Sequence, residues 1–124
     1  CTNQGLIATA ATIYMSLMGS AGLREVAVSC NANTYALVAA LTSVPGVSRQ
    51  FAAPFFHEAV VRLDRPVAAV LAALSAEGIL GGYDLTADYP ELGNALLVCA
   101  TETRSAADIA RYVAALTKIL GVAA

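Results

Sequence analysis

The feature that most constrains this chain is the near absence of charge from its first 48 residues. Only Arg24 and Glu25 separate two uncharged stretches, residues 1–23 and 26–48. A membrane-spanning helix needs about 20 predominantly apolar residues, and hydroxyl and amide side chains interrupt both stretches. Neither stretch begins with the basic residues of a signal peptide. We therefore expect both to be buried helices of a soluble protein.

The two uncharged stretches predict two helices joined by a turn. The first runs from about Asn3 to Met18 and is apolar nearly all round, which is typical of a helix buried on most faces. Gly19–Gly22 ends it, and the second runs from about Leu23 to Val44 with apolar residues at helical spacing. The first helix has more apolar faces than a lone two-layer domain can cover. We therefore expect it to pack on protein outside this sequence.

The composition limits the classes of partner. Apolar residues make up 58% of the 124 residues and charged residues only 13%, against about 25% charged in an average soluble domain. The formal net charge is −2 and no lysine or arginine cluster is present. These features exclude the usual electrostatic basis for binding nucleic acid or an anionic membrane. We expect neither partner, and the length corresponds to a single domain.

The cysteines indicate a reducing compartment. Cys1, Cys30 and Cys99 form no CxxC pair, and His57 is the only histidine. This set is poor material for a zinc site, so we expect no metal. Unpaired cysteines are typical of small buried apolar residues in a reduced protein, and the expected location is the cytoplasm. Because the chain starts at Cys1 rather than at methionine, we expect a fragment of a longer protein or a processed chain.

After residue 45 the pattern changes to short strands and helices. The order predicts an α/β fold, in which two helices cover a small, mainly antiparallel sheet to form a two-layer sandwich. We expect two parts, the connecting helices over residues 1–45 and a small sandwich domain over residues 46–124. In chain order the expected elements are strands at Val47–Phe51 and Phe55–Leu63, a helix from Pro66 to Gly78, a short strand at Ile79–Leu80, a loop over 81–93, a strand at Ala95–Ala100 buried on both faces, and a helix that Ser105 and Asp108 open with a variant capping box.

Four residues are candidates for a substrate or interface site. Gly81 and Gly82 allow another group to approach the backbone closely, although they form neither a GxGxxG motif nor a P-loop. Glu102 and Arg104 follow the predicted buried strand, and α/β proteins often carry binding groups at such positions. An arginine there can bind a carboxylate through two parallel hydrogen bonds. The alternative is a helix-entry turn with a surface ion pair between Glu102 and Arg104.

No residue is expected to be catalytic. His57 falls in phase with the apolar positions of its predicted strand, as core and interface histidines do, and no GxSxG motif is present. Lys118 lies in the last turns of the last helix, where lysine is favoured by the helix dipole. We expect it on the surface rather than in an imine with a cofactor. The acidic residues of the loop over 81–93 lack the spacing of an EF-hand.

Four stretches of the chain resemble one family. They are Cys1–Gln4, Gly22–Glu25, Pro54–Glu58 and Gly81–Arg104, the last of which contains YPELGNALLVCATETR. Together they resemble the C-terminal part of glycine dehydrogenase (aminomethyl-transferring) subunit 1, the alpha subunit of the glycine cleavage system P-protein. The resemblance covers essentially the whole chain, and the last stretch is its most specific part.

The resemblance implies the small C-terminal domain of a type I pyridoxal-phosphate-dependent transferase fold, preceded by helices that connect to a missing large domain. It implies a whole enzyme that decarboxylates glycine and transfers the aminomethyl group to the lipoyl H-protein, with the cofactor as electron sink. It also implies that the partner, P-protein subunit 2, carries the cofactor lysine. This fragment would then bind no cofactor, be inactive alone and have a structural role. Family members often have asparagine at the position of His57, so no family role is assigned to it.

A second hypothesis from another class stays open. In it the chain is a free-standing small-ligand-binding or regulatory α/β sandwich, with Gly81, Gly82 and Arg104 as its site. The first predicted helix separates the two hypotheses, because a free-standing domain needs a polar face there and this helix has none.

Overall fold

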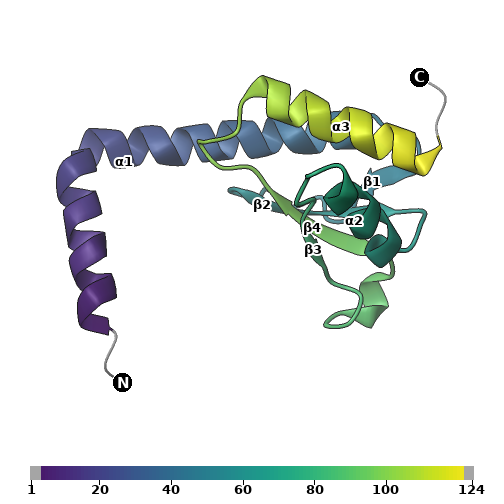
Figure 1. Ribbon diagram of the computed structural model, residues 1–124, viewed down its shortest axis with the longest axis horizontal. Coiled ribbons are helices and arrows are strands. Elements are labelled where there is room, and N and C mark those ends of the chain that lie inside the picture. Colours follow the sequence, from purple (N-terminus) through teal and green to yellow (C-terminus); the bar gives the residue numbers. More distant parts are fainter. Residues whose placement is uncertain (1–3, 122–124) are drawn as a thin grey trace.

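The longest element of the chain is a helix with a sharp bend (Figure 1). The computed structural model describes residues 4–121. Helix α1 spans Gln4–Thr42, and Gly19 interrupts it with φ 62° and ψ −176°. This left-handed backbone conformation favours glycine. The predicted break between two helices is confirmed, although one glycine makes it and the helix resumes at the next residue.

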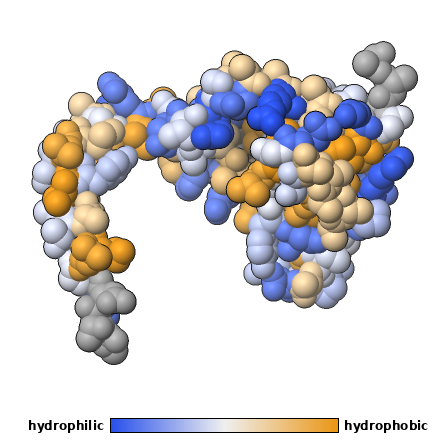
Figure 2. Space-filling model, viewed as in Figure 1, coloured by the Kyte–Doolittle hydropathy of each residue, from blue (hydrophilic) through white to orange (hydrophobic). Residues whose placement is uncertain are grey.

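Residues 4–18, which we call the arm, extend away from the rest of the molecule (Figure 1). Figure 2 shows apolar side chains on its surface. By length and composition α1 would suffice to cross a membrane, and none of its most apolar window is buried. The bend at Gly19 divides it, however, and the arm alone is shorter than the about 20 residues of a span. The exposed large apolar residues of the arm are Leu6, Ile7, Ile13, Tyr14, Met15 and Leu17.

Four strands form one antiparallel sheet in the order β1–β2–β4–β3. Strands β2 and β4 are the central pair, with Val61 opposite Leu96. Alternate residues of β2 are buried, as expected for a sheet with one face covered and one face open. The prediction of a small antiparallel sheet is confirmed. The strands are β1 Val47–Arg49, β2 Glu58–Leu63, β3 Tyr83–Asp84 and β4 Ala95–Cys99.

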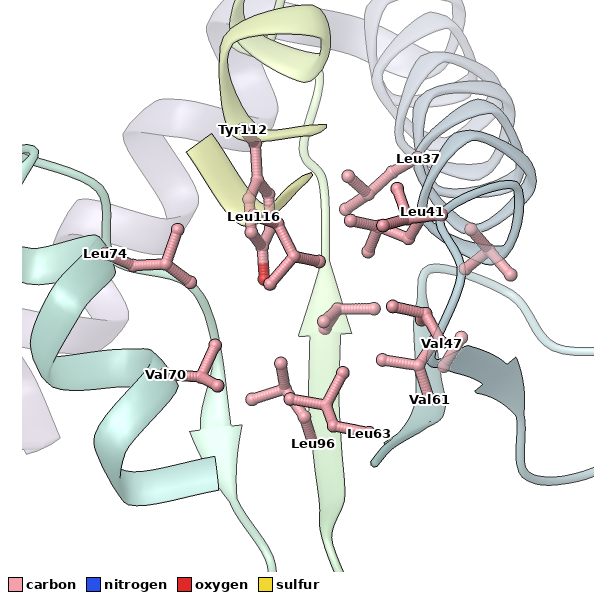
Figure 3. Close-up of a cluster of buried hydrophobic side chains, with 14 of the residues drawn as sticks. Leu37, Leu41, Val47, Val61, Leu63, Val70, Leu74, Leu96, Tyr112 and Leu116 are labelled. Carbon is pink, nitrogen blue, oxygen red and sulfur yellow. The ribbon is translucent and has the colours of Figure 1, made fainter. Parts of the chain in front are cut away.

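Helix α2 (Val67–Ala76), helix α3 (Ala106–Leu120) and the second half of α1 share one core with the sheet (Figure 3). The predicted two-layer sandwich is confirmed, but half of α1 joins the helical layer. The expected division into connecting helices over residues 1–45 and a sandwich domain over residues 46–124 concerns a longer subunit, so it stays a prediction. Core side chains include Leu37 and Leu41 of α1, Val61 and Leu63 of β2, Val70 and Leu74 of α2, Leu96 of β4, and Tyr112 and Leu116 of α3.

The start of α3 matches its sequence pattern. The hydroxyl of Ser105 accepts a hydrogen bond from the Asp108 N–H, and the Asp108 carboxylate accepts one from the Ser105 N–H at 2.8 Å. This reciprocal capping box satisfies two backbone donors at the helix start. At the other end Gly121 adopts a left-handed conformation and closes the helix.

Two details of the strand prediction are wrong, and the predicted loop over 81–93 contains short elements. The third strand is Tyr83–Asp84 rather than Ile79–Leu80, and a short 3-10 helix at Pro90–Leu92 follows it. Strand β4 is not buried on both faces, since Leu97 is half-buried and Cys99 is exposed. The physical reason is that the helices cover only one face of the sheet, so alternate residues of β4 face outward.

Candidate functional site

A pocket of about 520 Å³ lies at the end of β4, between the α2–β3 connection and the start of α3. Its volume is within the range of about 300–1,000 Å³ that is common for ligand pockets. Apolar side chains from α1, the α2–β3 connection, β4 and α3 form much of its wall. Among them are Leu37, Ile79, Leu97, Ile109 and Tyr112.

Three of the four predicted site residues line this pocket. They are Gly81, Gly82 and Arg104, which the fold brings together from the α2–β3 connection and from the turn before α3. Glu102 is not among the lining residues, although it lies two positions from Arg104. The predicted constellation is therefore only partly assembled around the pocket, and the role of these four residues stays a prediction.

The two glycines are required by packing. A β-carbon on Gly82 would lie 2.3 Å from the carbonyl oxygen of Leu97, and the residue has φ 139°. A β-carbon on Gly81 would lie 2.5 Å from Leu74 Cδ1 and 3.2 Å from the Tyr112 hydroxyl. That hydroxyl donates a hydrogen bond to the Gly81 carbonyl. The close approach that the sequence indicated here is thus made by the protein's own strand and helices.

Arg104 has an exposed guanidinium group with few partners. Its Nε and Nη2 donate to the Thr103 hydroxyl at 3.2 and 3.0 Å. The only ion pair among residues 4–121 joins Lys118 and Glu77, so the alternative of a Glu102–Arg104 surface pair is wrong. Arg104 keeps hydrogen-bonding capacity for a carboxylate on the side of the pocket.

Glu102 faces α1 instead. Its Oε2 accepts a hydrogen bond from Cys30 Sγ at 3.3 Å. Burial raises the pKa of the Cys30 thiol, and the hydrogen bond to Glu102 raises it further. Cys30 is therefore a neutral, buried donor, as the sequence predicted for this cysteine. Cys99 differs, because it is exposed at the pocket, and the prediction of burial is wrong for it. Cys1 lies outside the described residues.

Polar side chains of α1 hold the turn that carries Arg104. Asn33 Nδ2 donates to the carbonyls of Thr101 and Arg104, each at 2.9 Å. Thr34 is fully buried, and its hydroxyl exchanges hydrogen bonds with the backbone of Ala100. These contacts satisfy backbone groups just beyond the end of β4, and those of Ala100 are buried. The spacing of residues in α1 gives no sign of these contacts, because each joins groups at least 66 residues apart.

The charged residues of the pocket balance one another. Glu58 and Asp108 supply carboxylates, and Arg104 and Arg111 supply guanidinium groups. The Ser105 backbone N–H and hydroxyl hold the pKa of Asp108 below its usual range, so this carboxylate is ionised and committed to the helix cap. Arg111 donates to the Glu77 carbonyl at 2.5 Å. The four charged side chains therefore present both signs of charge to the pocket.

The remaining sequence candidates lie away from the pocket. His57 is half-buried just before β2 and makes an edge contact with the Phe56 ring. Lys118 is on the surface, as predicted, and its Nζ lies 2.8 Å from Glu77 Oε1. Within residues 4–121, no group of three histidine, cysteine or acidic residues is arranged to hold a metal ion.

The comparison with protein families decides what kind of chain this is. The family model described as the glycine cleavage system P-protein matches residues 1–116. The chain belongs to the P-protein family. It is 61% identical over 120 residues to a probable glycine dehydrogenase (decarboxylating) subunit 1 of Methylococcus capsulatus (strain Bath). The aligned region covers 97% of this chain and 26% of that protein. The same-named protein of Legionella pneumophila (strain Paris) is 57% identical, with the same coverage.

A solved structure agrees with the family match. The crystal structure of glycine decarboxylase (P-protein) of the glycine cleavage system, in inhibitor-bound form, superposes with a TM-score of 0.80 at 32% identity. The match covers 86% of this chain and 24% of that chain. This member of the P-protein family therefore spans about a quarter of the length of the relatives that it matches.

Proposed function

We propose that these residues are the small C-terminal domain, with its connecting helices, of a glycine dehydrogenase (decarboxylating) subunit 1. In the whole enzyme, glycine would lose its carboxyl group and the aminomethyl group would pass to the lipoyl arm of the H-protein. The 61% identity to a subunit of this name, over a quarter of its length, supports this function. The role of the domain itself would be structural.

The exposed arm is the observation that carries the proposal. Leu17 is 81% exposed, Leu6 76% and Ile7 68%. Apolar side chains of this size on one short helix are a surface that protein normally covers. We infer that the large domain of the same subunit covers the arm. The alternative of a free-standing ligand-binding sandwich leaves this surface without an explanation.

The lysine of this chain does not fit the cofactor. Pyridoxal phosphate, when bound to the P-protein, supplies an electron sink for decarboxylation, and its lysine must be desolvated to form an imine at neutral pH. Lys118 is the only lysine; its side chain is 75% exposed and paired with Glu77. The hydrogen bond that Lys118 donates to Glu77 raises the pKa of Lys118, which further disfavours the neutral amine. In this proposal the cofactor lysine therefore lies outside residues 1–124, and subunit 2 carries it.

The further partners in this proposal are P-protein subunit 2 and the lipoyl H-protein, with no nucleic acid and no membrane. The apolar bent helix and the match to an enzyme family support a protein partner for α1. The free thiols of Cys30 and Cys99 support a cytoplasmic location.

A chimera tests the function. The matching quarter of the Methylococcus capsulatus subunit 1 is replaced by residues 1–124, and glycine decarboxylation is measured with subunit 2 and H-protein. We expect an active enzyme that needs all three proteins. Ile13→Asp with Leu17→Asp should lower the activity at least about tenfold by charging the covered arm, since a buried unpaired charge is strongly unfavourable. The control Ala87→Asp lies in an exposed loop and should have no effect.

A measurement on the 124-residue chain completes the test. With the arm uncovered, the chain should self-associate and bind a hydrophobic dye. Light scattering over a range of concentrations checks this. A stable monomer that binds no dye, or an inactive chimera that folds and assembles, would contradict the proposed function.

A further inference from the structure

Strand β4 extends two residues past the end of its pairing with β3. In an antiparallel sheet, successive residues direct their N–H and C=O groups to opposite neighbours. The Leu85 N–H donates to the Ala95 carbonyl on the β3 side, and the Leu63 N–H donates to the Asn94 carbonyl on the β2 side. Counting by twos from Ala95, the backbone groups of Cys99 point to the β3 side.

Cys99 finds no partner there. In the register of β3 with β4, Tyr83 lies opposite Leu97, so Gly81 would be the residue opposite Cys99. No hydrogen bond joins these two residues, and within residues 4–121 the Cys99 backbone has none on this side. Both an N–H and a C=O of a strand are therefore unpaired at the wall of the pocket. Such an edge is a template for another strand.

The fold itself keeps this edge open. The Gly81 carbonyl, which would pair with Cys99, accepts the hydrogen bond of the Tyr112 hydroxyl instead. Gly81 is buried, and Leu71 and Leu74 pack where its β-carbon would be. The Gly81 carbonyl is thus bonded to the helical layer and not to β4. Gly81 therefore cannot pair with Cys99 without breaking this packing.

The surroundings of the edge fit an extended segment. The pocket of about 520 Å³ adjoins Cys99, with Leu97 and Ile109 on its wall and Leu80 at its rim. Leu80 is 96% exposed, so it adds an apolar surface beside the edge. Arg104 lines the same pocket and has no ion-pair partner among the described residues.

We propose that an extended segment of the same subunit, from outside residues 1–124, adds to β4 at Cys99 as a further short strand. It pairs with the Cys99 N–H and C=O, covers Leu80 with an apolar side chain and presents a carboxylate to Arg104. The proposal rests on the proposed function, because the relatives are about four times as long as the matching region. The segment comes from the part of the subunit that this chain lacks.

Hydrogen exchange in the 124-residue chain and in the chimera tests the proposal. The peptide that contains Cys99 reports the strand addition, and a peptide from residues 4–18 reports docking of the arm. We expect the Cys99 amide to exchange rapidly in the 124-residue chain and at least about tenfold more slowly in the chimera, because exchange requires the hydrogen bond to open. Labelling of the Cys99 thiol is followed in parallel.

Matched variants in the chimera sharpen the test. Leu80→Asp should restore rapid exchange at Cys99, whereas Ala87→Asp in the exposed β3–β4 loop should not. Arg104→Gln should reduce the protection of Cys99 more than Arg65→Gln, which alters an exposed arginine before α2. In each variant the exchange of the arm should stay as in the parent chimera.

The outcomes separate this proposal from the proposed function. If the arm is protected but the Cys99 amide still exchanges rapidly, the strand addition is wrong while the proposed function stands. Protection of the thiol without protection of the amide also overturns it, because side chains and not a strand would then cover the edge. Slow exchange already in the 124-residue chain overturns it as well. If the arm gains no protection in the chimera, the proposed function fails.

Discussion

The two halves of α1 have similar composition and opposite surroundings. Before Gly19, every described residue up to Leu17 is exposed, whereas after it the helix supplies Leu37, Val38 and Leu41 to the core. Leu17 is 81% exposed and Leu41 is fully buried. The hydrophobic effect favours burial of both leucines by about the same amount. What differs is that residues of this chain cover Leu41, whereas none of the described residues covers Leu17.

The polar side chains show the same contrast. In the arm, the hydroxyls of Thr9, Thr12 and Ser16 bond back to carbonyls one turn earlier in the same helix. In the second half, Asn33 and Thr34 bond to backbone groups 66 or more residues away. The hydroxyls of the arm thus bond only within their own helix, whereas the second half of α1 forms hydrogen bonds across the fold. Four predictions test this contrast, in order of decreasing effect.

Leu41→Ala and Leu17→Ala make the same change in the two halves. Leu41→Ala should lower the free energy of unfolding by about 2–5 kcal/mol, because it leaves a cavity in a packed core. Leu17→Ala should change it by at most about 0.5 kcal/mol, as for other exposed sites. Urea unfolding measures both free energies, at a dilution that keeps the chain monomeric. Equal losses would show that the arm is packed in this chain.

Thr34→Val and Thr12→Val compare the two kinds of hydroxyl. Thr34→Val keeps the shape but leaves the buried N–H and C=O of Ala100 without their partner, which should cost about 1–3 kcal/mol. Thr12 bonds only to the Ala8 carbonyl on an exposed surface, so Thr12→Val should be nearly neutral. Thermal unfolding of both variants provides the comparison. A neutral Thr34→Val would mean that water replaces the hydroxyl.

Gly19→Ala acts on the boundary itself. Because alanine is disfavoured in a left-handed conformation by about 1 kcal/mol or more, the variant should reduce the bend rather than keep it. Gly22→Ala is the control, since its β-carbon meets only the flexible Met18 side chain. Small-angle X-ray scattering should show a changed radius of gyration for Gly19→Ala alone. An unchanged radius in both would indicate that the bend does not depend on glycine.

The pH dependence gives the smallest effect. The Ser105 N–H and hydroxyl lower the pKa of Asp108, so its contribution to stability is present above the unfolded-state pKa. It is lost as the pH falls through the lowered folded-state pKa. Residues 4–23 contain no acidic or basic side chain, so acid should loosen the α3 cap without affecting the arm. Asp108→Asn should weaken this acid dependence, as circular dichroism from pH 6 to pH 2 can show. An equal acid response in Asp108→Asn would exclude the cap as its source.

Much of the fold could be predicted because its signals are local. The capping box at Ser105 and Asp108, the alternation of β2 and the break at Gly19 each depend on a few neighbouring residues. Strand β3 could not be found in this way. Its position depends on Tyr112, which draws the Gly81 carbonyl into the helical layer, and no pattern around Gly81 encodes a partner 31 residues later.

The candidate site was predictable only as separate pieces. Gly81, Gly82 and Arg104 each had a local signal, and the fold brings them to one pocket. Glu102 has the same strand-end signal as Arg104 but faces Cys30. Which way two residues of one turn point depends on α1, which lies some 70 residues earlier in the chain. The residues near the turn therefore do not predict its contacts with α1.

The bend at Gly19 makes the position of the arm sensitive to small rotations of one backbone. Fifteen residues beyond the bend, at 1.5 Å per residue, give a reach of about 22 Å. A rotation of about 10° at the backbone of one glycine therefore moves the tip by roughly 4 Å, close to the distance between neighbouring side chains. A glycine alone cannot hold an angle that tightly. If the large domain covers the arm, as we propose, the contacts along the arm and not the backbone of Gly19 then determine its direction.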